Sequence, residues 1–328
     1  MIISRSPLRI SLFGGGTDFP EYYNSHDGEV LSFAIDKYTY INLRYLQNYF
    51  GQKFRLRYFN NEMVNKIDMI KHPVIRECLK KYFKRENIGL EIIHNSDIPA
   101  RTGLGSSSSF TNALIAGLKK IENSKILNKK LFYETIQMEQ KILKEYVGSQ
   151  DQVITSLGGF KYIKFSKKKI DFKSIDHKKF DIIKKNILLL FLGFDRDAKA
   201  IEKSKIINIK KKLHHYNTLK EICREAYKVL NSDQDMSMYK YFSELMKEQW
   251  KLKKSLSKKV SNNKIDNLYE YSLKNGANCG KILGAGGGGF MMFFCNSKRN
   301  KLKLKTSLKK MITVDFNLDL EGTKIIYG

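Results

Sequence analysis

The chain has 328 residues, of which 42% are hydrophobic, and it carries a formal net charge of +27. This length allows two domains, or one large core with a smaller satellite. Its apolar stretches, such as 187–192 and 290–295, have the length of strands and fall well short of the roughly 20 residues that a membrane helix needs. Because Arg5 and Arg9 interrupt the apolar residues after Met1, we also expect no secretory signal.

The positive charge is spread over many segments and accompanies no recognisable nucleic-acid module. The lysines lie mostly on the polar faces of predicted helices, which favours a solvated surface over a nucleic-acid site. A positive field would still help to collect anionic substrates. The four cysteines are scattered without Cys-x-x-Cys spacing, so we expect no zinc site, reduced thiols and a cytoplasmic location.

Strand patterns dominate the first part of the chain. Alternating or β-branched residues predict strands at 2–13, 30–46, 53–59 and 90–94. Helical periodicity then predicts helices at 106–122 and 130–146, with Asn128 as the N-cap of the second, and a short helix at 152–157. Two glycines at 158 and 159 end that helix, and a strand returns at 160–165.

Helices dominate the second part of the chain. After an apolar strand at 187–192, the pattern predicts helices at 197–214, 216–231, 237–257 and 264–275, a β-hairpin formed by 276–283 and 289–295, a helix at 298–311 and strands at the end. Strands gathered early and helices gathered late favour an α+β fold over a doubly wound α/β fold. We place the boundary in the Lys/Ile/Asp-rich stretch 166–185, which gives domains at 1–175 and 176–328.

Three glycine-rich motifs lie at 7–18, 99–109 and 283–290. Glycine allows the backbone to turn through positive φ and brings peptide N–H groups close to a ligand. In the middle motif, Gly103-Leu104-Gly105 and four serines lead directly into the predicted helix 106–122. Since unpaired N–H groups and the helix dipole point at the same place, this helix start predicts an anion site suited to phosphates.

Other nucleotide-binding motifs fit less well. No Gly-x-x-x-x-Gly-Lys-Ser/Thr loop is present, and Asp195-Arg196-Asp197 lacks the downstream Asn and Asp-Phe-Gly of protein kinases. A Gly-x-Gly-x-x-Gly pattern can be drawn through 284–289, but it lies too near the end of the sequence for a leading βαβ unit.

The three motifs, in this order and spread over nearly the whole chain, resemble those of the galactokinase, homoserine kinase, mevalonate kinase and phosphomevalonate kinase (GHMP) superfamily. The resemblance implies an N-terminal domain like part of a ribosomal protein, a C-terminal ferredoxin-like domain and an active site between them. It also implies ATP and Mg²⁺ as cofactors. The nucleotide loop would consist of Gly103, Leu104, Gly105, Ser106, Ser107 and Ser108.

The same resemblance assigns roles to individual residues. Asp151 would act as the base or orienter of the acceptor hydroxyl, and Arg9 would offset charge on the transferring phosphoryl group. Ser107 and Glu139 would hold Mg²⁺, with Glu145 as an alternative to Glu139. The residues expected to meet the substrate are Gly15, Gly16, Thr17, Asp18 and Gly287.

The first motif narrows the acceptor. Galactokinases carry Gly-Glu-His-Thr-Asp where this chain has Gly-Gly-Gly-Thr-Asp at 14–18, which argues against galactose and leaves room for a larger sugar. Over essentially its full length the chain looks like the D-glycero-D-manno-heptose 7-phosphate kinases, which phosphorylate the C1 hydroxyl with ATP. A phosphorylated substrate needs a basic clamp, for which Arg101, Arg196 and Lys199 are candidates.

Other interpretations remain open from the sequence. One is a kinase for another sugar, such as a fucose-like or other hexose. A second is a ligand sensor on a kinase scaffold, against which the retained Arg9, Glu139 and Asp151 argue. A third is a basic RNA-binding protein, suggested by the charge and the ribosomal-like half. The kinase interpretation predicts a sugar phosphate and ATP as partners, no nucleic acid and no membrane, and leaves a homodimer open.

Overall fold

A computed structural model describes residues 1–85, 88–193, 198–232 and 236–328. Within these residues the larger sheet has eight strands, of which six follow the order β11-β1-β2-β5-β3-β4, while β6 and β7 extend from β2. The bounds of its strands are β1 Ile2–Phe13, β2 Gly28–Leu46, β3 Phe54–Arg57, β4 Asn61–Val64, β5 Gly89–Ser96, β6 Phe160–Phe165, β7 Ile170–Ile175 and β11 Lys324–Tyr327.

The long strand β2 is central to this sheet, because β5 and β6 pair with different parts of one of its edges. On the other edge, β1 pairs with it from Ile2 opposite Leu43 to Phe13 opposite Leu31. Residues 28–33 of β2 pair with β6 and residues 39–46 pair with β5, all antiparallel. β1 therefore lies inside the sheet, and its end runs directly into the first glycine motif.

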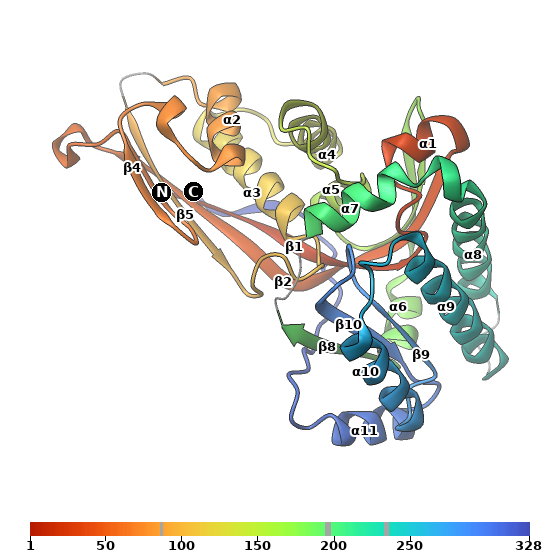
Figure 1. The fold of residues 1–328 in the computed structure, drawn as a ribbon. Helices are drawn as coiled ribbons and strands as arrows, with labels where there is room; N and C mark the ends of the chain where they lie inside the picture. The colour runs from red at the N-terminus through yellow and green to blue at the C-terminus, as the bar shows by residue number, and fades with distance from the viewer. Residues whose placement is uncertain (86–87, 194–197, 233–235) are drawn as a thin grey trace.

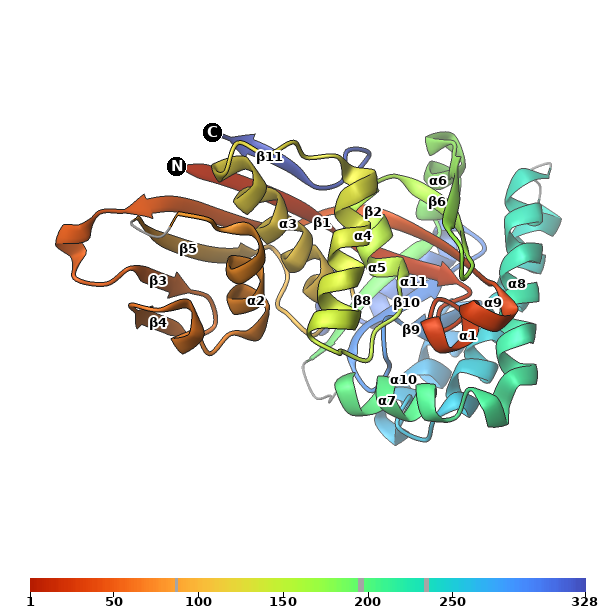
Figure 2. The same ribbon diagram turned by 90° about the horizontal axis from the view of Figure 1, so that it is seen from above.

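Helices cover one face of the large sheet (Figures 1 and 2). They are α2 (Pro73–Tyr82), α3 (Ser106–Ile121), α4 (Asn128–Ile136) and α5 (Gln150–Leu157). α3 packs closely on β2 because Gly117 faces that strand, where a Cβ would lie only 2.8 Å from Leu43 Cδ1. The short α1 (Pro20–His26) follows the first glycine motif and leads into β2.

The second half forms a smaller antiparallel sheet in the order β8-β10-β9. Its strands are β8 Ile187–Gly193, β9 Cys279–Ile282 and β10 Gly289–Phe294. The accompanying helices are α6 His177–Lys184, α7 Ala198–Ile207, α8 Leu213–Asn231, α9 Met236–Leu256, α10 Asn263–Lys274 and α11 Lys298–Ser307. α8 and α9 lie side by side beyond the end of β1 (Figure 1).

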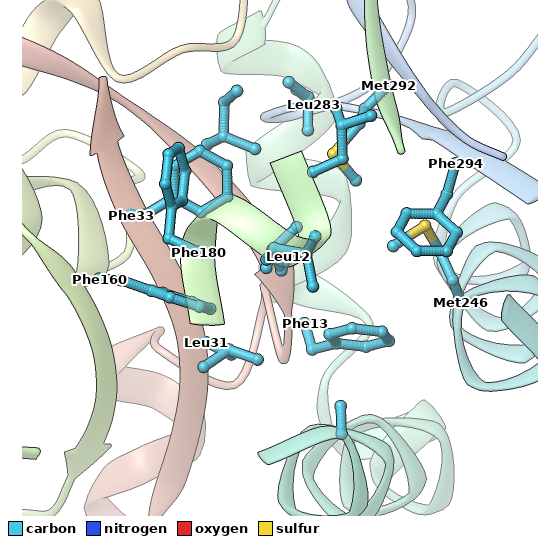
Figure 3. Close-up of a cluster of buried hydrophobic side chains, with 14 of the residues drawn as sticks. Leu12, Phe13, Leu31, Phe33, Phe160, Phe180, Met246, Leu283, Met292 and Phe294 are labelled. Carbon is cyan, nitrogen blue, oxygen red and sulfur yellow. The ribbon is translucent and has the colours of Figure 1, made fainter. Parts of the chain in front are cut away.

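The main hydrophobic cluster joins the two halves (Figure 3). Phe33 of β2 meets Phe180 of α6 edge to face, with ring centroids 5.0 Å apart. Phe13, at the end of β1, makes the same kind of contact with Phe242 of α9 at 5.0 Å. This packing fixes the first glycine motif, which follows Phe13, against the helices of the second half.

The α+β fold is confirmed, and most predicted elements are present with shifted ends. The helix predicted at 130–146 is shorter, since α4 ends at Ile136 and a π-helical turn, Gln137–Ile142, follows. Asn128 is not an N-cap, because Leu127 holds that position and Asn128 begins α4. The sequence pattern did not predict α1, α2 or β4, which are short.

The stretch 166–185 is part of the packed structure and not a linker. β7 pairs with β6, and α6 buries Phe180 and Ile183 in the main cluster. The last strand, β11, pairs with β1 so that Tyr327 lies opposite Ile3 and the two termini are neighbours (Figures 1 and 2). A domain division at residue 175 stays a prediction, because the large sheet takes one strand from the end of the chain.

Among the described residues, no helix combines the length and the apolar character that crossing a membrane requires.

Candidate active site

Arg9 and Asp151 form a bidentate ion pair at the centre of the candidate site. Arg9 lies on β1 with only 3% of its surface exposed, and Asp151 lies in the first turn of α5. Arg9 Nε donates to Asp151 Oδ1 and Nη2 donates to Oδ2, each at 2.7 Å. Nη1 donates to the carbonyl of Gly103 at 2.6 Å. One guanidinium group therefore connects the predicted base with the predicted nucleotide loop.

The nucleotide loop turns into α3 at Gly105, which has a left-handed φ of +76°. A Cβ there would lie 3.0 Å from Arg9 Cγ and 3.3 Å from Asp151 Oδ2, so glycine lets the loop approach the ion pair. Because glycine has no side chain that could cap the helix, the first-turn N–H groups at 106–108 stay available to an anion. The start of α3 thus fits the phosphates of a nucleotide.

The third glycine motif packs directly on the nucleotide loop. A Cβ on Gly284 would lie 2.6 Å from Gly103 Cα, and a Cβ on Gly289 would lie 2.2 Å from the carbonyl oxygen of Thr102. Phe290 N–H donates to that same carbonyl at 3.0 Å. These glycines are explained by the close approach of two loops, so the third motif holds the nucleotide loop in position.

Asp18 presents a second carboxylate near Asp151. Only 2% of Asp18 is exposed, and its carboxylate accepts the backbone N–H of Gly16 at 2.9 Å and of Gln150 at 3.2 Å. Burial, and then the charge of Asp151, raise the pKa of Asp18 above its usual value. Gly148 lies against this carboxylate, since a Cβ there would come within 1.9 Å of Asp18 Oδ2.

We expect Gly148→Ala to displace the Asp18 carboxylate and to lower the free energy of unfolding by roughly 1–3 kcal/mol, as overpacking does. Urea unfolding would measure this cost in the wild type and in Asp18→Ala. Because Asp18→Ala removes the crowded atoms, Gly148→Ala should cost less in that background. Equal costs in both backgrounds would contradict the role given to Gly148.

Glu139 faces the start of α3 from the π-helical turn. Its Oε2 accepts the hydroxyl of Ser108 at 2.9 Å and Gln152 Nε2 at 2.5 Å. Burial, reinforced by the charge of Glu145, raises the pKa of Glu139 to about 7. Its other oxygen, Oε1, is buried and accepts no well-formed hydrogen bond among the described residues, since the nearby Thr111 hydroxyl, which lowers the pKa of Glu139, donates to the carbonyl of Ser107.

This unpartnered oxygen fits a cation. The described part of the chain holds no group of three or more His, Cys, Asp or Glu side chains arranged for a metal. Mg²⁺ bound with a nucleotide needs fewer protein ligands, because it keeps several waters and takes the rest of its oxygens from phosphates. Glu139 and a serine hydroxyl beside it are therefore a sufficient protein contribution.

The serine beside Glu139 is Ser108 and not the predicted Ser107. Ser107 is exposed on α3, whereas Ser108 lies one position further around the helix and points to the interior. Ser107 lies in the exposed first turn of α3. Ser107 forms no hydrogen bond with Glu139, and its assignment to Mg²⁺ stays a prediction.

One cavity is lined by Arg9, Asp18 and Asp151 and also by residues from the second half of the chain. Four of these were not indicated by the motifs: Lys205 of α7, Gln249 and Lys253 of α9, and Lys281 of β9. Gln249 and Lys253 continue the stripe of buried residues 242, 245 and 246 along α9 at helical spacing. That stripe was the available signal for both residues.

Gln249 fixes the first glycine motif to α9. Its Oε1 accepts the N–H of Gly14 at 2.9 Å, and its Nε2 donates to the carbonyl of Leu12 at 2.7 Å. Gly15 and Gly16, predicted to meet the substrate, line the cavity just beyond this anchor. Their backbone is therefore held at a fixed distance from the helices of the second half.

Thr17 is turned away from the cavity. It is fully buried, its hydroxyl lies 2.8 Å from the carbonyl of Gly14, and it accepts the N–H of Glu29 at 3.0 Å. These bonds commit its hydroxyl to closing the loop onto β2, and a substrate-binding role of Thr17 stays a prediction.

The remaining predicted substrate residues lie outside this cavity wall or outside the described residues. Gly287 donates its N–H to the carbonyl of Val260 at 2.8 Å, within the third glycine motif. Arg101 has a left-handed φ of +64° and is exposed on the nucleotide loop. Arg196 lies in the segment 194–197, and the side chain of Lys199 is likewise outside the described part of the structure.

Comparison with known proteins agrees with this geometry. Residues 70–159 match the GHMP kinases N terminal domain. A D-glycero-alpha-D-manno-heptose 7-phosphate kinase from Campylobacter jejuni is 26% identical over 98% of this chain and 98% of its own length. The crystal structure of a D-glycero-D-manno-heptose 1-phosphate kinase from Bacteroides thetaiotaomicron has a TM-score of 0.79 at 18% identity and covers 100% of both chains. Mevalonate kinase from Methanococcus jannaschii has a TM-score of 0.73 at 19% identity, covering 97% of this chain and 98% of its own.

The matched domain and the shared fold place the chain in a class of ATP-dependent phosphotransferases that act on small molecules. More narrowly, residues 70–159 match the GHMP kinase N-terminal domain, and the full chain is similar in sequence to a kinase of that group.

Proposed function

We propose that this protein is a GHMP kinase that transfers the γ-phosphoryl group of ATP to the anomeric C1 hydroxyl of D-glycero-D-manno-heptose 7-phosphate, giving the 1,7-bisphosphate for GDP-heptose synthesis. The observation that carries the proposal is the bidentate Arg9–Asp151 pair at the wall of a cavity that also holds Asp18. The Campylobacter jejuni relative, whose name specifies a heptose 7-phosphate, supports this acceptor because it aligns with 98% of the chain.

In the proposed reaction, Asp151 orients the acceptor hydroxyl and takes its proton. The hydroxyl oxygen forms the new bond to the γ-phosphorus, the bond to the bridging oxygen breaks, and ADP leaves with that electron pair. Arg9 holds both oxygens of Asp151, so the carboxylate has one orientation when the acceptor arrives. Bound Mg²⁺ would offset the charge of the phosphates, and Glu139 with Ser108 would hold it.

Asp18 would select the acceptor. A buried carboxylate that already accepts two backbone N–H groups still has lone pairs for sugar hydroxyls. The glycines at 14–16 put no side chains beside it, which leaves space for a sugar with an extended chain. This arrangement supports a heptose better than a compact acceptor.

The test is ADP release with Mg²⁺-ATP over a panel of heptose 7-phosphate, unphosphorylated heptose, mannose, fucose and galactose. We expect turnover on heptose 7-phosphate to exceed that on every free sugar, and phosphorus NMR of the product to show a new anomeric phosphate. Turnover confined to a free sugar would show that the proposed acceptor is wrong but that the protein is a sugar kinase. ATP binding without turnover on any sugar would favour a ligand sensor.

A further inference from the structure

Three lysines are buried together in the wall of the candidate active-site cavity. Lys205, Lys253 and Lys281, called the lysine cluster below, have 4%, 9% and 3% of their surface exposed and come from α7, α9 and β9. Lysine is almost never buried without a partner, because removing an ammonium group from water is costly. A cluster of three in one cavity therefore either loses protons or is stabilised by a compensating negative charge.

Protein carboxylates supply only part of that charge. Of the cavity-lining ionisable groups, Arg9 pairs with Asp151, and Lys205 pairs with Glu202 at 2.5 Å. Among the described residues, no carboxylate forms an ion pair with Lys253 or Lys281. The remaining carboxylate of the cavity, Asp18, is held by backbone N–H groups.

The ammonium groups of Lys253 and Lys281 donate to backbone carbonyl groups, but not with all of their N–H donors. Lys253 Nζ donates to the carbonyls of Ile282 and Gly284, each at 2.7 Å, and Lys281 Nζ donates to the carbonyl of Leu12 at 2.8 Å. An ammonium group has three N–H donors. These contacts fix the position of both nitrogens while keeping at least one donor on each for a ligand.

The electrostatics of the cavity favour the binding of an anion. Burial lowers the pKa of Lys281 to about 7, with Arg9 and Lys205 adding to the effect while Cys223 opposes it. Burial also lowers the pKa of Lys253, which Lys281, Lys205 and Arg9 lower further and Glu202 raises. The two groups thus repel each other's charge, and a dianion between them would relieve that repulsion.

We propose that Lys253 and Lys281, with Lys205 beside them, bind the phosphate monoester that the acceptor carries. This assignment rests on the proposed function and goes beyond it by naming the residues that recognise the phosphorylated acceptor. A phosphate monoester carries close to two negative charges at neutral pH, which matches the two ammonium groups that lack a carboxylate partner.

The lysine cluster shares one cavity with the two acidic residues, so one sugar phosphate can contact both. Asp151 and Asp18 reach the cavity from the first half of the chain, whereas the lysines reach it from the second half. An acceptor bridging them would present its hydroxyl to Asp151 and its phosphate to the cluster. The predicted clamp residue Arg101 is exposed and does not line this cavity. We therefore assign the binding of the substrate phosphate to the lysine cluster instead of Arg101.

The kinetic test compares Lys253→Met and Lys281→Met with Lys251→Met, a matched control at an exposed position of the same helix. We expect both cluster variants to raise KM for heptose 7-phosphate by about 10- to 100-fold, as loss of a charged hydrogen bond does. Their activity on unphosphorylated heptose should change much less, so the preference for the phosphorylated sugar falls. A loss of kcat on both sugars with unchanged preference would overturn the proposal and assign the lysines to the transferred phosphoryl group.

A binding test separates this proposal from the proposed function. Inorganic phosphate should raise the melting temperature of the wild type and of Lys251→Met but not of Lys253→Met or Lys281→Met, even if no sugar is turned over. Stabilisation of all four proteins alike, or of none, would overturn the lysine assignment while leaving any measured kinase activity intact.

A measurement on the wild type alone covers the case in which the cluster variants do not fold. Sulfate, which does not titrate near neutral pH, should bind with uptake of protons because an anion raises the lowered pKa values of Lys253 and Lys281. Titration calorimetry at pH 8 in two buffers of different ionisation enthalpy measures that uptake. Sulfate binding without proton uptake, or no binding, would count against the cluster.

Discussion

Asp151→Asn should lower kcat by about 1,000-fold, within the range for loss of a positioned general base. The amide keeps the size of the side chain but has no carboxylate to take the acceptor proton, and it presents Arg9 with one oxygen instead of two. Steady-state kinetics at saturating ATP would measure the loss. KM for ATP should stay within a few-fold, because the start of α3 is unchanged.

The control for this variant is Asp171→Asn, at an exposed position of the β6–β7 hairpin where Asp171 pairs with Lys169. It removes the same charge from the surface and should leave kcat unaltered. Arg9 would be left buried without its charge partner in Asp151→Asn, so some loss of stability is expected as well. A kcat within about three-fold of the wild type, in a folded variant, would exclude Asp151 from the proton-transfer step.

The parts of the site that could be predicted from the sequence are those carried by local motifs. Gly105 before a run of serines marks the start of α3, and Arg9, Asp18, Glu139 and Asp151 sit at recognisable distances from glycines. The structure brings Arg9, Asp18 and Asp151 together at one cavity, with Ser108 on its wall and Glu139 hydrogen-bonded to Ser108. Asp18 and Asp151 lie within three positions of Gly16 and Gly148, whereas the roles of Arg9 and Glu139 were implied by the resemblance to known kinases.

The second half of the cavity could not be predicted in the same way. Gln249, Lys253 and Lys281 lie within lysine-rich segments, where one buried lysine looks like many exposed ones. Their roles depend on how α9 and β9 pack against the end of β1. Contacts between residues distant in sequence determine that packing. The run of serines at 106–109 illustrates the same limit on a smaller scale, because which serine faces Glu139 depends on the rotation of α3.

Glu139→Gln should separate activity from stability. The variant removes the charge that would hold Mg²⁺, and we expect kcat to fall by roughly 100-fold, the size typical of losing one group that stabilises transition-state charge. The amide oxygen can still accept the hydrogen bonds from Ser108 and Gln152. The fold should therefore survive. A variant that keeps the kcat of the wild type, and whose activity depends less on Mg²⁺ concentration, would contradict the metal role.

The contribution of Glu139 to the stability of the wild type should depend on pH in the direction opposite to that of a carboxylate whose pKa is lowered on folding. Burial raises the pKa of Glu139 from 4.5 to about 7, so the folded protein keeps a proton that the unfolded chain releases. As pH rises from 4.5 to 7, the wild type therefore loses stability that the variant, having nothing to titrate there, keeps. Between pH 5 and pH 8 the difference in unfolding free energy should move by about 2 kcal/mol in favour of the variant.

Urea unfolding at both pH values, without metal or nucleotide, measures this difference. Its change with pH is informative because constant costs, such as an amide N–H₂ group left without an acceptor, cancel. Adding Mg²⁺ and a nonhydrolysable ATP analogue at pH 8 should raise the free energy of unfolding of the wild type more than that of the variant. The reason is that a cation beside Glu139 favours its charged form. If the difference between the two proteins were the same at pH 5 and pH 8, Glu139 would not be the buried, proton-holding carboxyl group that its unpartnered oxygen indicates.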